Sequence, residues 1–304
     1  KKTEKNYTGM LLLGAGFASA IGGTSTILGG NPNAITAAFL SDIHLFTFID
    51  WSRIGFPVSF IMFFTAYFTI LKIYKVKDEK IKLAALEKEA KKIKFNHQQT
   101  KILLIFFPTI LLWLFGDNIG SFLNFPQDFY RTEIIGLTSA ILLFVFKILD
   151  WDDVRRVPWE IFLLVGGGLT LGHILIQTGA ASFIASKLIS QISFLPVPAI
   201  IFVFVVLAMV LANFVNNSST TIILVPVLIE SASFLDINVN LISMAIAFAT
   251  AIAPLTPIAM PAFSLIYGTG HVRRKEMITT GFKVASVCGP ILAIILSLMH
   301  WFWF

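Results

Sequence analysis

Amide and hydroxyl side chains gather in one stretch of the chain, NFVNNSSTTIILVP, which runs from Asn213 to Pro226. The stretch follows an apolar segment, about 197–211, that has the composition of a membrane helix. Carbonyl and hydroxyl oxygens suit a hard monovalent cation such as sodium, whereas amide N–H groups, hydroxyls and helix N-termini suit a carboxylate or sulfate oxygen. The stretch therefore has the chemistry of a site for a cation, an oxyanion or both.

The same residues also have structural roles open to them, because they can cap two half-helices or bond neighbouring helices together. Six polar residues in succession, 216–221, exceed what capping requires. Unpaired polar groups at hydrocarbon depth cost several kcal/mol each, so such a tip must face protein or a water-filled cavity. We therefore prefer a binding tip to a purely structural one.

Two further segments have the composition of unwound loops within apolar runs. IGGTSTILGGNPNAI, Ile21 to Ile35, carries four glycines and a proline, and AIAPLTPIAMPAFSLIYGTG, Ala251 to Gly270, carries three prolines. Pro removes a helical donor and Gly tolerates unusual dihedrals, so both segments are predicted to break at mid-depth and expose carbonyl groups. A simple kink is the alternative, although a single proline would be enough to produce it.

Composition places these segments in a membrane. The 304 residues are 56% apolar and only 13% charged, and the mean hydropathy is +0.82. Several stretches approach the roughly 20 apolar residues that cross a bilayer as a helix. We therefore predict an all-α, multi-pass integral protein of the cell (inner or plasma) membrane.

The charged and reactive residues exclude several other classes. Ten of the 23 basic residues fall between Lys72 and Lys101, so the net charge of +6 is a topology signal and does not imply nucleic acid. The single cysteine, Cys288, cannot form an internal disulfide and is interpreted as a packing residue. The sequence shows neither a metal-ligand spacing nor a nucleophile–base constellation, so a transporter is favoured over an enzyme.

The basic residues also predict the topology. Segments 75–101, 150–156 and 271–276 should be cytoplasmic, with two spans, 102–116 and 132–149, between the first two. The basic segments all fall on the cytoplasmic side only if 197–234 enters and leaves the membrane on the same side, as a re-entrant hairpin with its tip, Asn216–Ser219, near the bilayer midplane.

The two broken segments occupy matching places in an incomplete repeat. The first precedes a full span at 54–74 and the second precedes one at 278–299, and the charge pattern gives them opposite orientations. Opposite orientation of equivalent units is typical of an inverted repeat, whose substrate and ion sites lie at the repeat interface. By symmetry, more than about a hundred residues, including a first hairpin, are expected upstream.

Five co-linear motifs, spread over nearly the whole chain, resemble the divalent anion:sodium symporter family, whose members carry di- and tricarboxylates or sulfate. The motifs are GTSTILGGNPNAI, DWSRIGFPVSF, PWEIFLLVGGGLTLGHILIQTG, NFVNNSSTT and LTPIAMPAFSLIYGTGH. The chain is similar to the last two-thirds of such a transporter. The resemblance implies no cofactor beyond sodium as coupling ion, and a homodimer.

The resemblance also implies the site. The family's Ser-Asn-Thr tip corresponds to Asn216, Asn217 and Ser218, and its sodium-facing loop residues correspond to Gly29 and Ala259. Substrate contacts are then expected at Asn31, Pro32, Asn216, Asn217, Ser218, Met260 and Pro261. Sodium contacts are expected at Thr26, Gly29, Asn213, Asn217 and Ala259.

Three positions depart from the family pattern. Asn216 replaces a serine, a change that could alter substrate preference, and Met260 replaces a hydroxyl residue and Phe263 an asparagine, two changes that make the second half less polar. With the first tip absent, the chain is expected to hold one complete sodium-type site and half of another.

The preferred interpretation is a sodium-coupled, elevator-type transporter of divalent organic anions such as succinate or malate. The resemblance implies transport-domain parts at 1–74 and 197–304, a cytoplasmic amphipathic connector at 75–101, scaffold spans at 102–180 and an interfacial connecting helix at 181–196. A sulfate or citrate transporter, a sodium-independent anion exchanger of the same fold, and a structural membrane subunit stay open as alternatives.

Overall fold

The computed structural model describes residues 2–44, 46–75, 96–123, 126, 129, 131–157 and 159–303. Its regular structure in these residues is helical, without a strand. The helices are α1 (Lys2–Gly23), η1 (Ile27–Gly29), α2 (Asn31–Ser41), α3 (Phe48–Tyr74), α5 (His97–Leu123), α6 (Thr132–Val145), α7 (Trp151–Arg155), α8 (Glu160–Gln177), α9 (Ala180–Ile192), α10 (Val197–Val215), α11 (Asn217–Leu235), α12 (Val239–Ile252), α13 (Pro261–Gly268) and α14 (Arg274–Trp303). Most of the predicted amphipathic connector, 76–95, lies outside the described residues.

The chain forms two compact units. The larger unit comprises Lys1–Phe46, Asp50–Val76 and Leu163–Phe304, and the smaller one comprises Thr47–Ile49 and Lys77–Phe162. All three polar or interrupted segments singled out in the sequence belong to the larger unit. The candidate site can therefore be described within that unit alone.

Helices of membrane length confirm the predicted class. Among the described residues five helices are long and apolar enough to cross a bilayer, and α8 with α9 forms a further pair bent by 71°. The predicted span at 132–149 is shorter than expected, because α6 ends at Val145 after 14 residues. A helix of that length covers about 21 Å, less than the roughly 30 Å of a hydrocarbon core.

Both predicted breaks occur in the structure. Helix α1 ends at Gly23, and a loop that contains η1 leads to α2, whose first residue is Asn31. Helix α12 ends at Ile252, and an irregular stretch leads to α13, whose first residue is Pro261. The prolines and glycines therefore interrupt the helices over 24–30 and 253–260, a narrower region than the sequence motifs suggested.

The predicted hairpin is formed by α10 and α11, which meet at Asn216. This residue adopts φ 89° and ψ 166°, a region that side-chain-bearing residues rarely occupy, and so turns the chain within a single position. Its side-chain oxygen accepts a hydrogen bond from the N–H of Ser219 at 2.9 Å and caps α11. Asn216 thus has the structural role that sequence analysis kept open for this stretch.

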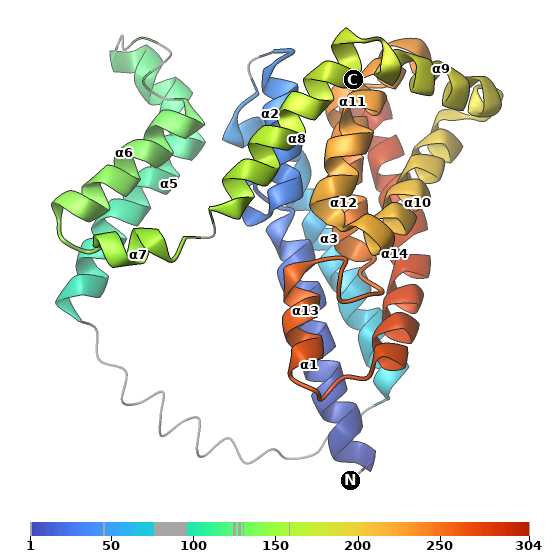
Figure 1. Cartoon of the computed structure of the whole chain (residues 1–304), viewed down its shortest axis with the longest axis horizontal. Coiled ribbons are helices and arrows are strands. Elements are labelled where there is room, and N and C mark those ends of the chain that lie inside the picture. Colours follow the sequence, from blue (N-terminus) through green and yellow to red (C-terminus); the bar gives the residue numbers. More distant parts are fainter. Residues whose placement is uncertain are drawn as a thin grey trace. The chain divides into compact units, whose positions relative to one another are not determined.

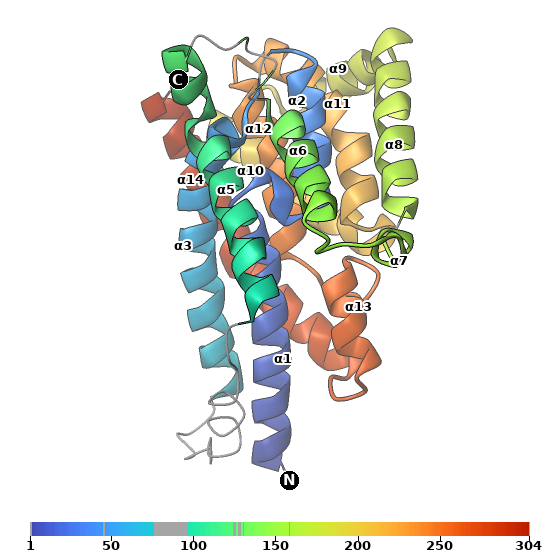
Figure 2. The same ribbon diagram turned by 90° about the vertical axis from the view of Figure 1, so that its left-hand side faces the viewer.

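The two broken helices run in opposite directions, as an inverted repeat requires. Figures 1 and 2 show α1 and α2 rising from the N-terminal end of the larger unit while α12 and α13 descend toward it. The long helix that comes after each broken helix approaches the loop closely at a Gly-Phe pair, Gly55-Phe56 in α3 and Gly281-Phe282 in α14. A Cβ added to Gly55 would lie 2.7 Å from the carbonyl oxygen of Thr24, and one added to Gly281 would lie 2.7 Å from that of Pro254. The fold class predicted from the sequence is confirmed.

These close approaches predict the effect of a substitution. Gly281→Ala places a methyl group against the backbone of the second loop, so we expect a loss of about 1–3 kcal/mol in stability despite the better helix propensity of Ala. The midpoint of thermal unfolding of the full-length protein, measured in detergent, should fall. Gly167→Ala in α8 is the matched control, because an added Cβ there has no heavy atom within 4 Å. An equal midpoint for both variants would contradict the close packing of α14 on the loop.

Candidate functional site

A cavity of about 210 Å³ lies where both interrupted helices meet the hairpin tip. Its walls come from the end of α1, the first turns of α2 and α13, the C-terminal half of α12, and Asn217 of α11. No charged side chain lines it within the described part of the chain. Drug-sized ligands occupy pockets of about 300–1,000 Å³, so this cavity suits a smaller molecule.

Three helix N-termini converge on the cavity. Gly30 to Asn33 form the start of α2, Met260 to Ala262 form the start of α13, and Asn217 is the first residue of α11, and all of them line it. Each N-terminus carries a partial positive charge of about half an elementary charge. Neither α2 nor α13 has a side-chain cap. The oxygens of a bound anion can therefore act as the missing caps of α2 and α13, while the C-terminal ends of α1 and α12, which also line the cavity, contribute partial negative charge.

Asn217 ties the hairpin tip to the second loop. Its backbone N–H donates a hydrogen bond to the carbonyl oxygen of Ala259 at 3.0 Å. Its side-chain oxygen accepts from the N–H of Ser218 at 2.8 Å, and the side chain is buried. The side-chain NH₂ group of Asn217 forms no hydrogen bond within the described residues, so it is left as a donor at the cavity wall.

Asn213, one turn before the tip, clamps the same loop through both ends of its amide. The side-chain oxygen accepts from the N–H groups of Leu255, at 2.7 Å, and Thr256, at 3.1 Å. The side-chain nitrogen donates to the carbonyl oxygens of Met209, at 2.7 Å, and Ala253, at 2.8 Å. Both acceptor positions of the oxygen are occupied, so in this structure Asn213 acts as a clamp and offers no free side-chain oxygen to the predicted sodium ion.

The first loop is braced by different residues. The side-chain nitrogen of Asn33 donates to the carbonyl oxygens of Gly23, at 2.9 Å, and Thr26, at 2.8 Å. The indole N–H of the buried Trp51 donates to the carbonyl oxygen of Thr24 at 2.9 Å. Gly29 passes so close to the carbonyl oxygen of Gly23 that a Cβ at Gly29 would overlap it. Among the described residues, these bonds to the first loop come from α2 and α3 and none of them from the α10–α11 hairpin.

The two halves consequently differ at one equivalent position. Phe263, which the sequence aligns with Asn33, is fully buried and packs edge-on against Phe17 with ring centroids 5.0 Å apart. A phenyl ring cannot bond the loop carbonyls, so the second loop depends on Asn213 of the hairpin for the bonds that Asn33 supplies in the first.

The structure brings about half of the predicted site residues to the cavity. Those that line it are Gly29, Asn31, Pro32, Asn217, Met260 and Pro261. Those that do not line it are Thr26, Asn213, Asn216, Ser218 and Ala259. The latter group lies in the loops and tip around the cavity, where Thr26 and Ala259 offer carbonyl groups and Asn213 and Asn216 hold the backbone. Their roles as ligands stay predictions.

Sequence analysis missed the part of the lining that α12 contributes. Ala247 and Ala251 lie four residues apart on one face of α12 and form a cavity wall. Small apolar side chains in an apolar run carry no local sign of such a position. Asn33 was also missed, although its place after Pro32 in the first loop motif was visible.

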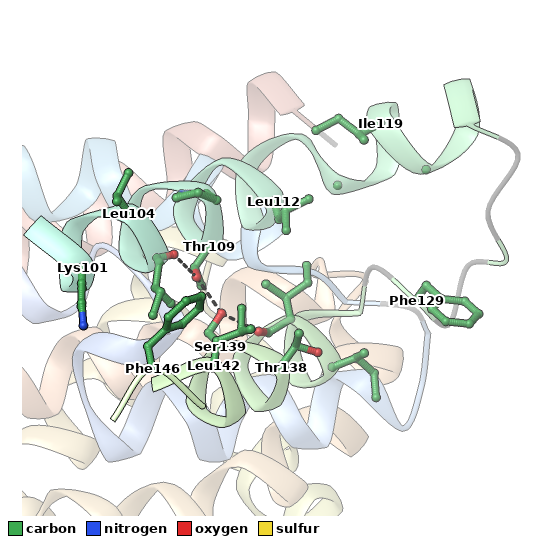
Figure 3. A pocket seen from close by; sticks show the side chains of 16 residues that line it. Lys101, Leu104, Thr109, Leu112, Ile119, Phe129, Thr138, Ser139, Leu142 and Phe146 are labelled. Atoms are coloured by element: carbon green, nitrogen blue, oxygen red, sulfur yellow. Dashed lines mark hydrogen bonds between the residues drawn. The ribbon is translucent and has the colours of Figure 1, made fainter. Parts of the chain in front are cut away.

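A larger cavity, of about 700 Å³, lies in the smaller unit between α5 and α6 (Figure 3). Lys101 and Phe129 lie toward its opposite ends, and most of its wall is aliphatic. The hydroxyl oxygens of Thr109 and Ser139 lie 2.6 Å apart, and each also lies within hydrogen-bond distance of a carbonyl oxygen one turn back in its helix; one hydroxyl therefore donates to the other, which donates to its carbonyl oxygen. A cavity of this kind suits hydrocarbon better than a hydrophilic anion.

His173 of α8 is bonded between helices. Its Nε2 lies 3.2 Å from Oδ2 of Asp42, the residue that follows α2. Both side chains are about half exposed. A histidine bonded between helices is the interpretation favoured for such a residue inside an apolar span.

Two interrupted helices, a hairpin tip between them and a cavity without charged side chains are typical of a secondary transporter with inverted repeats. The sequence model described as the sodium:sulfate symporter transmembrane region matches residues 1–304. The chain belongs to this family, which confirms the resemblance seen in its motifs, and it is a multi-pass membrane protein.

Individual relatives agree with this assignment. An uncharacterized transporter of Methanocaldococcus jannaschii is 28% identical over 97% of this chain and 65% of its own length. The sodium-dependent dicarboxylate transporter SdcS of Staphylococcus saprophyticus is 26% identical over 90% of this chain and 55% of its own. Solute carrier family 13 member 1 of Mus musculus is 25% identical over 96% of this chain and 56% of its own. The chain thus spans between 55% and 65% of the length of these relatives.

Proposed function

We propose that the full-length protein is a sodium-coupled secondary transporter of divalent organic anions, C4-dicarboxylates such as succinate or malate. The observation that carries the proposal is the convergence of three helix N-termini on one small cavity that lacks charged side chains. The N–H groups of these termini can bind the oxygens of an anion but cannot neutralise two negative charges by themselves. Coupling to cations supplies the remaining charge, so anion affinity should depend on sodium.

The loops offer the groups that a sodium ion requires. Carbonyl oxygens of the two interrupted segments lie beside the tip, as the bond between Asn217 and Ala259 demonstrates for the second half. Neutral oxygens from unwound backbone are suitable ligands for a small hard cation. Sodium bound between tip and loop would stabilise the tip against the loop and thereby complete the anion site.

The polarity of the cavity wall and the name of one relative support a dicarboxylate, and the size of the cavity favours a small anion. A cavity of about 210 Å³ is small by the standards of ligand pockets. Met260 contributes to its wall where a hydroxyl is common in the family, so one side is less polar than a sulfate ion would favour. The relative SdcS is named a sodium-dependent dicarboxylate transporter.

The mechanism that we propose is elevator-like. The larger unit holds the cavity, both broken helices and the hairpin, so the site can move as one body; this unit also includes 163–196, of which the resemblance assigns 163–180 to the scaffold. The parts 1–74 and 197–304 would move, and 102–180 would belong to a scaffold that forms a homodimer. Cross-links that fix α5 to the moving part should block uptake if this division holds.

Uptake by purified full-length protein in liposomes tests the proposal. Under an inward sodium gradient we expect accumulation of labelled succinate, and replacement of sodium by potassium should reduce the initial rate at least about tenfold if binding of the dianion needs sodium. Competition by citrate and by sulfate identifies the preferred anion. Sodium-independent succinate exchange would favour an exchanger of the same fold, and no uptake of any of these anions would refute a transport role.

A further inference from the structure

A layer of buried hydroxyl side chains lies directly behind the cavity. Thr36 follows the lining residue Pro32 by four positions on α2, and Thr221 follows Asn217 by four on α11. Ser243 precedes the lining residue Ala247 by four positions on α12. Residues four apart share one face of a helix, so each hydroxyl residue continues a face that reaches the cavity.

The direction of the helices places the three residues on the same side. Helices α2 and α11 lead away from the cavity at their N-termini, whereas α12 approaches it with its C-terminal half. Thr36 and Thr221 lie one turn after the cavity residues of α2 and α11, and Ser243 lies one turn before the cavity residues of α12. Each of the three is therefore displaced about 6 Å along its helix axis from the lining, in the same direction. The three helices also pack against one another pairwise. Thr36, Thr221 and Ser243 are each 0% exposed, which fits a common position between the helices.

Two of these hydroxyls lack the bond that such groups normally form. The buried Ser and Thr hydroxyls of the described residues bond a helix carbonyl or another side chain, with two exceptions, Thr36 and Ser243. Thr221 donates to the carbonyl oxygen of Asn217 at 2.9 Å, so its oxygen lone pairs stay free. A buried hydroxyl without a partner is costly, and native proteins satisfy nearly all of them. The layer therefore has acceptor oxygens ready for a small ligand.

We propose that Thr36, Thr221 and Ser243 supply three of the oxygen ligands of a sodium ion bound behind the anion cavity, an inference that rests on the proposed function. Hydroxyl oxygens are suitable ligands for a hard cation. A buried cation among neutral groups is stable only when an opposite charge lies close, and the anion cavity is one helical turn away. This ion would therefore bind together with the substrate, and each would raise the affinity for the other.

Thermal unfolding of the full-length protein tests this site without measuring transport. Midpoints are compared in sodium chloride and in N-methylglucamine chloride at equal ionic strength, with saturating succinate, for the wild type, Thr36→Val and Ser243→Ala. Without sodium, we expect both variants to be as stable as the wild type or more stable, because each loses an unpaired polar group. In sodium, their stabilisation should be smaller, and the sodium concentration for half-maximal effect should rise roughly tenfold per hydroxyl, the factor that corresponds to 1.4 kcal/mol of binding energy.

Ser231→Ala and Ser297→Ala are matched controls, because these buried hydroxyls donate to carbonyl oxygens in their own helices. They should lower the midpoint equally with and without sodium. An unchanged sodium effect in Thr36→Val and Ser243→Ala would overturn the site and leave an ordered water as the occupant. If the sodium effect on the midpoint is unchanged in those two variants and sodium-driven succinate uptake persists, the proposed function stands while this inference falls; if the wild type shows neither a sodium effect nor uptake, both fall.

Discussion

Asn217→Ala is expected to lower the apparent affinity for the transported anion about 10–100-fold, because a hydrogen bond to a charged group contributes about 1.5–3 kcal/mol. The side-chain NH₂ group of Asn217 is the donor that faces the cavity, and alanine removes it. The backbone N–H that bonds Ala259 is kept, so the tip should stay attached to the second loop. Succinate binding in sodium, measured by calorimetry on the full-length protein, gives the change in affinity.

Two further variants distinguish a binding role of Asn217 from a structural role. Asn217→Asp keeps the shape but places a negative charge beside the anion, so it should weaken binding more than alanine does. Gln191→Ala removes an amide from an exposed position of α9 and should change nothing. If Asn217→Ala lowers the unfolding midpoint but leaves sodium-dependent anion binding intact, the residue is structural and the site lies elsewhere.

Asn213→Ala is expected to destabilise the protein by about 3–5 kcal/mol, since several backbone groups lose their partners and each unpaired buried group costs about 1–3 kcal/mol. The carbonyl of Ala253 and the N–H groups of Leu255 and Thr256 are the groups concerned. The second loop should become mobile, and sodium-dependent anion binding should weaken as a consequence. Urea or thermal unfolding in sodium-free buffer measures the change in unfolding free energy separately from any change in sodium binding.

Two other substitutions, Asn33→Ala and Asn213→Asp, show whether Asn213 holds the second loop or binds sodium. Asn33→Ala should cause a similar loss at the first loop, because Asn33 donates two hydrogen bonds to loop carbonyls. Asn213→Asp keeps the acceptor for Leu255 and Thr256 but loses the donor, so its stability should be intermediate. A sodium ligand without a clamping role would give the opposite pattern, with normal stability in the absence of sodium and a loss confined to sodium binding.

The elements of the site were predictable because local chemistry determines them. Gly and Pro cannot continue a membrane helix without disruption, so their density over Ile21–Ile35 and Ala251–Gly270 located both breaks. A polar run between two apolar segments likewise located the hairpin turn, which the structure places at Asn216. Charge pattern alone supplied the opposite orientation of the two halves.

The contacts between helices at the site could not be predicted from the sequence. The bonds of Asn213 join residues about forty positions apart, and an asparagine near a tip is as compatible with ion binding as with clamping. Ala247 and Ala251 are indistinguishable from packing residues until α12 is placed beside the cavity. Helix α6 ends at Val145 although the apolar run continues to Leu149, because the chain turns at Lys147, where φ is 55°. Hydropathy measures the preference of side chains for lipid and carries no information on backbone dihedral angles, so this turn could not be predicted from it.

The hydrogen bonds of Asn213 make the shape of the second loop depend on the position of α10. Asn33 and Trp51 bond the first loop from α2 and α3, so its shape does not depend on α10 or α11. A displacement of the α10–α11 hairpin should therefore deform the second loop, through the groups that Asn213 bonds, and leave the first loop unchanged. Hydrogen exchange at the N–H groups of Leu255 and Thr256 should report such a displacement.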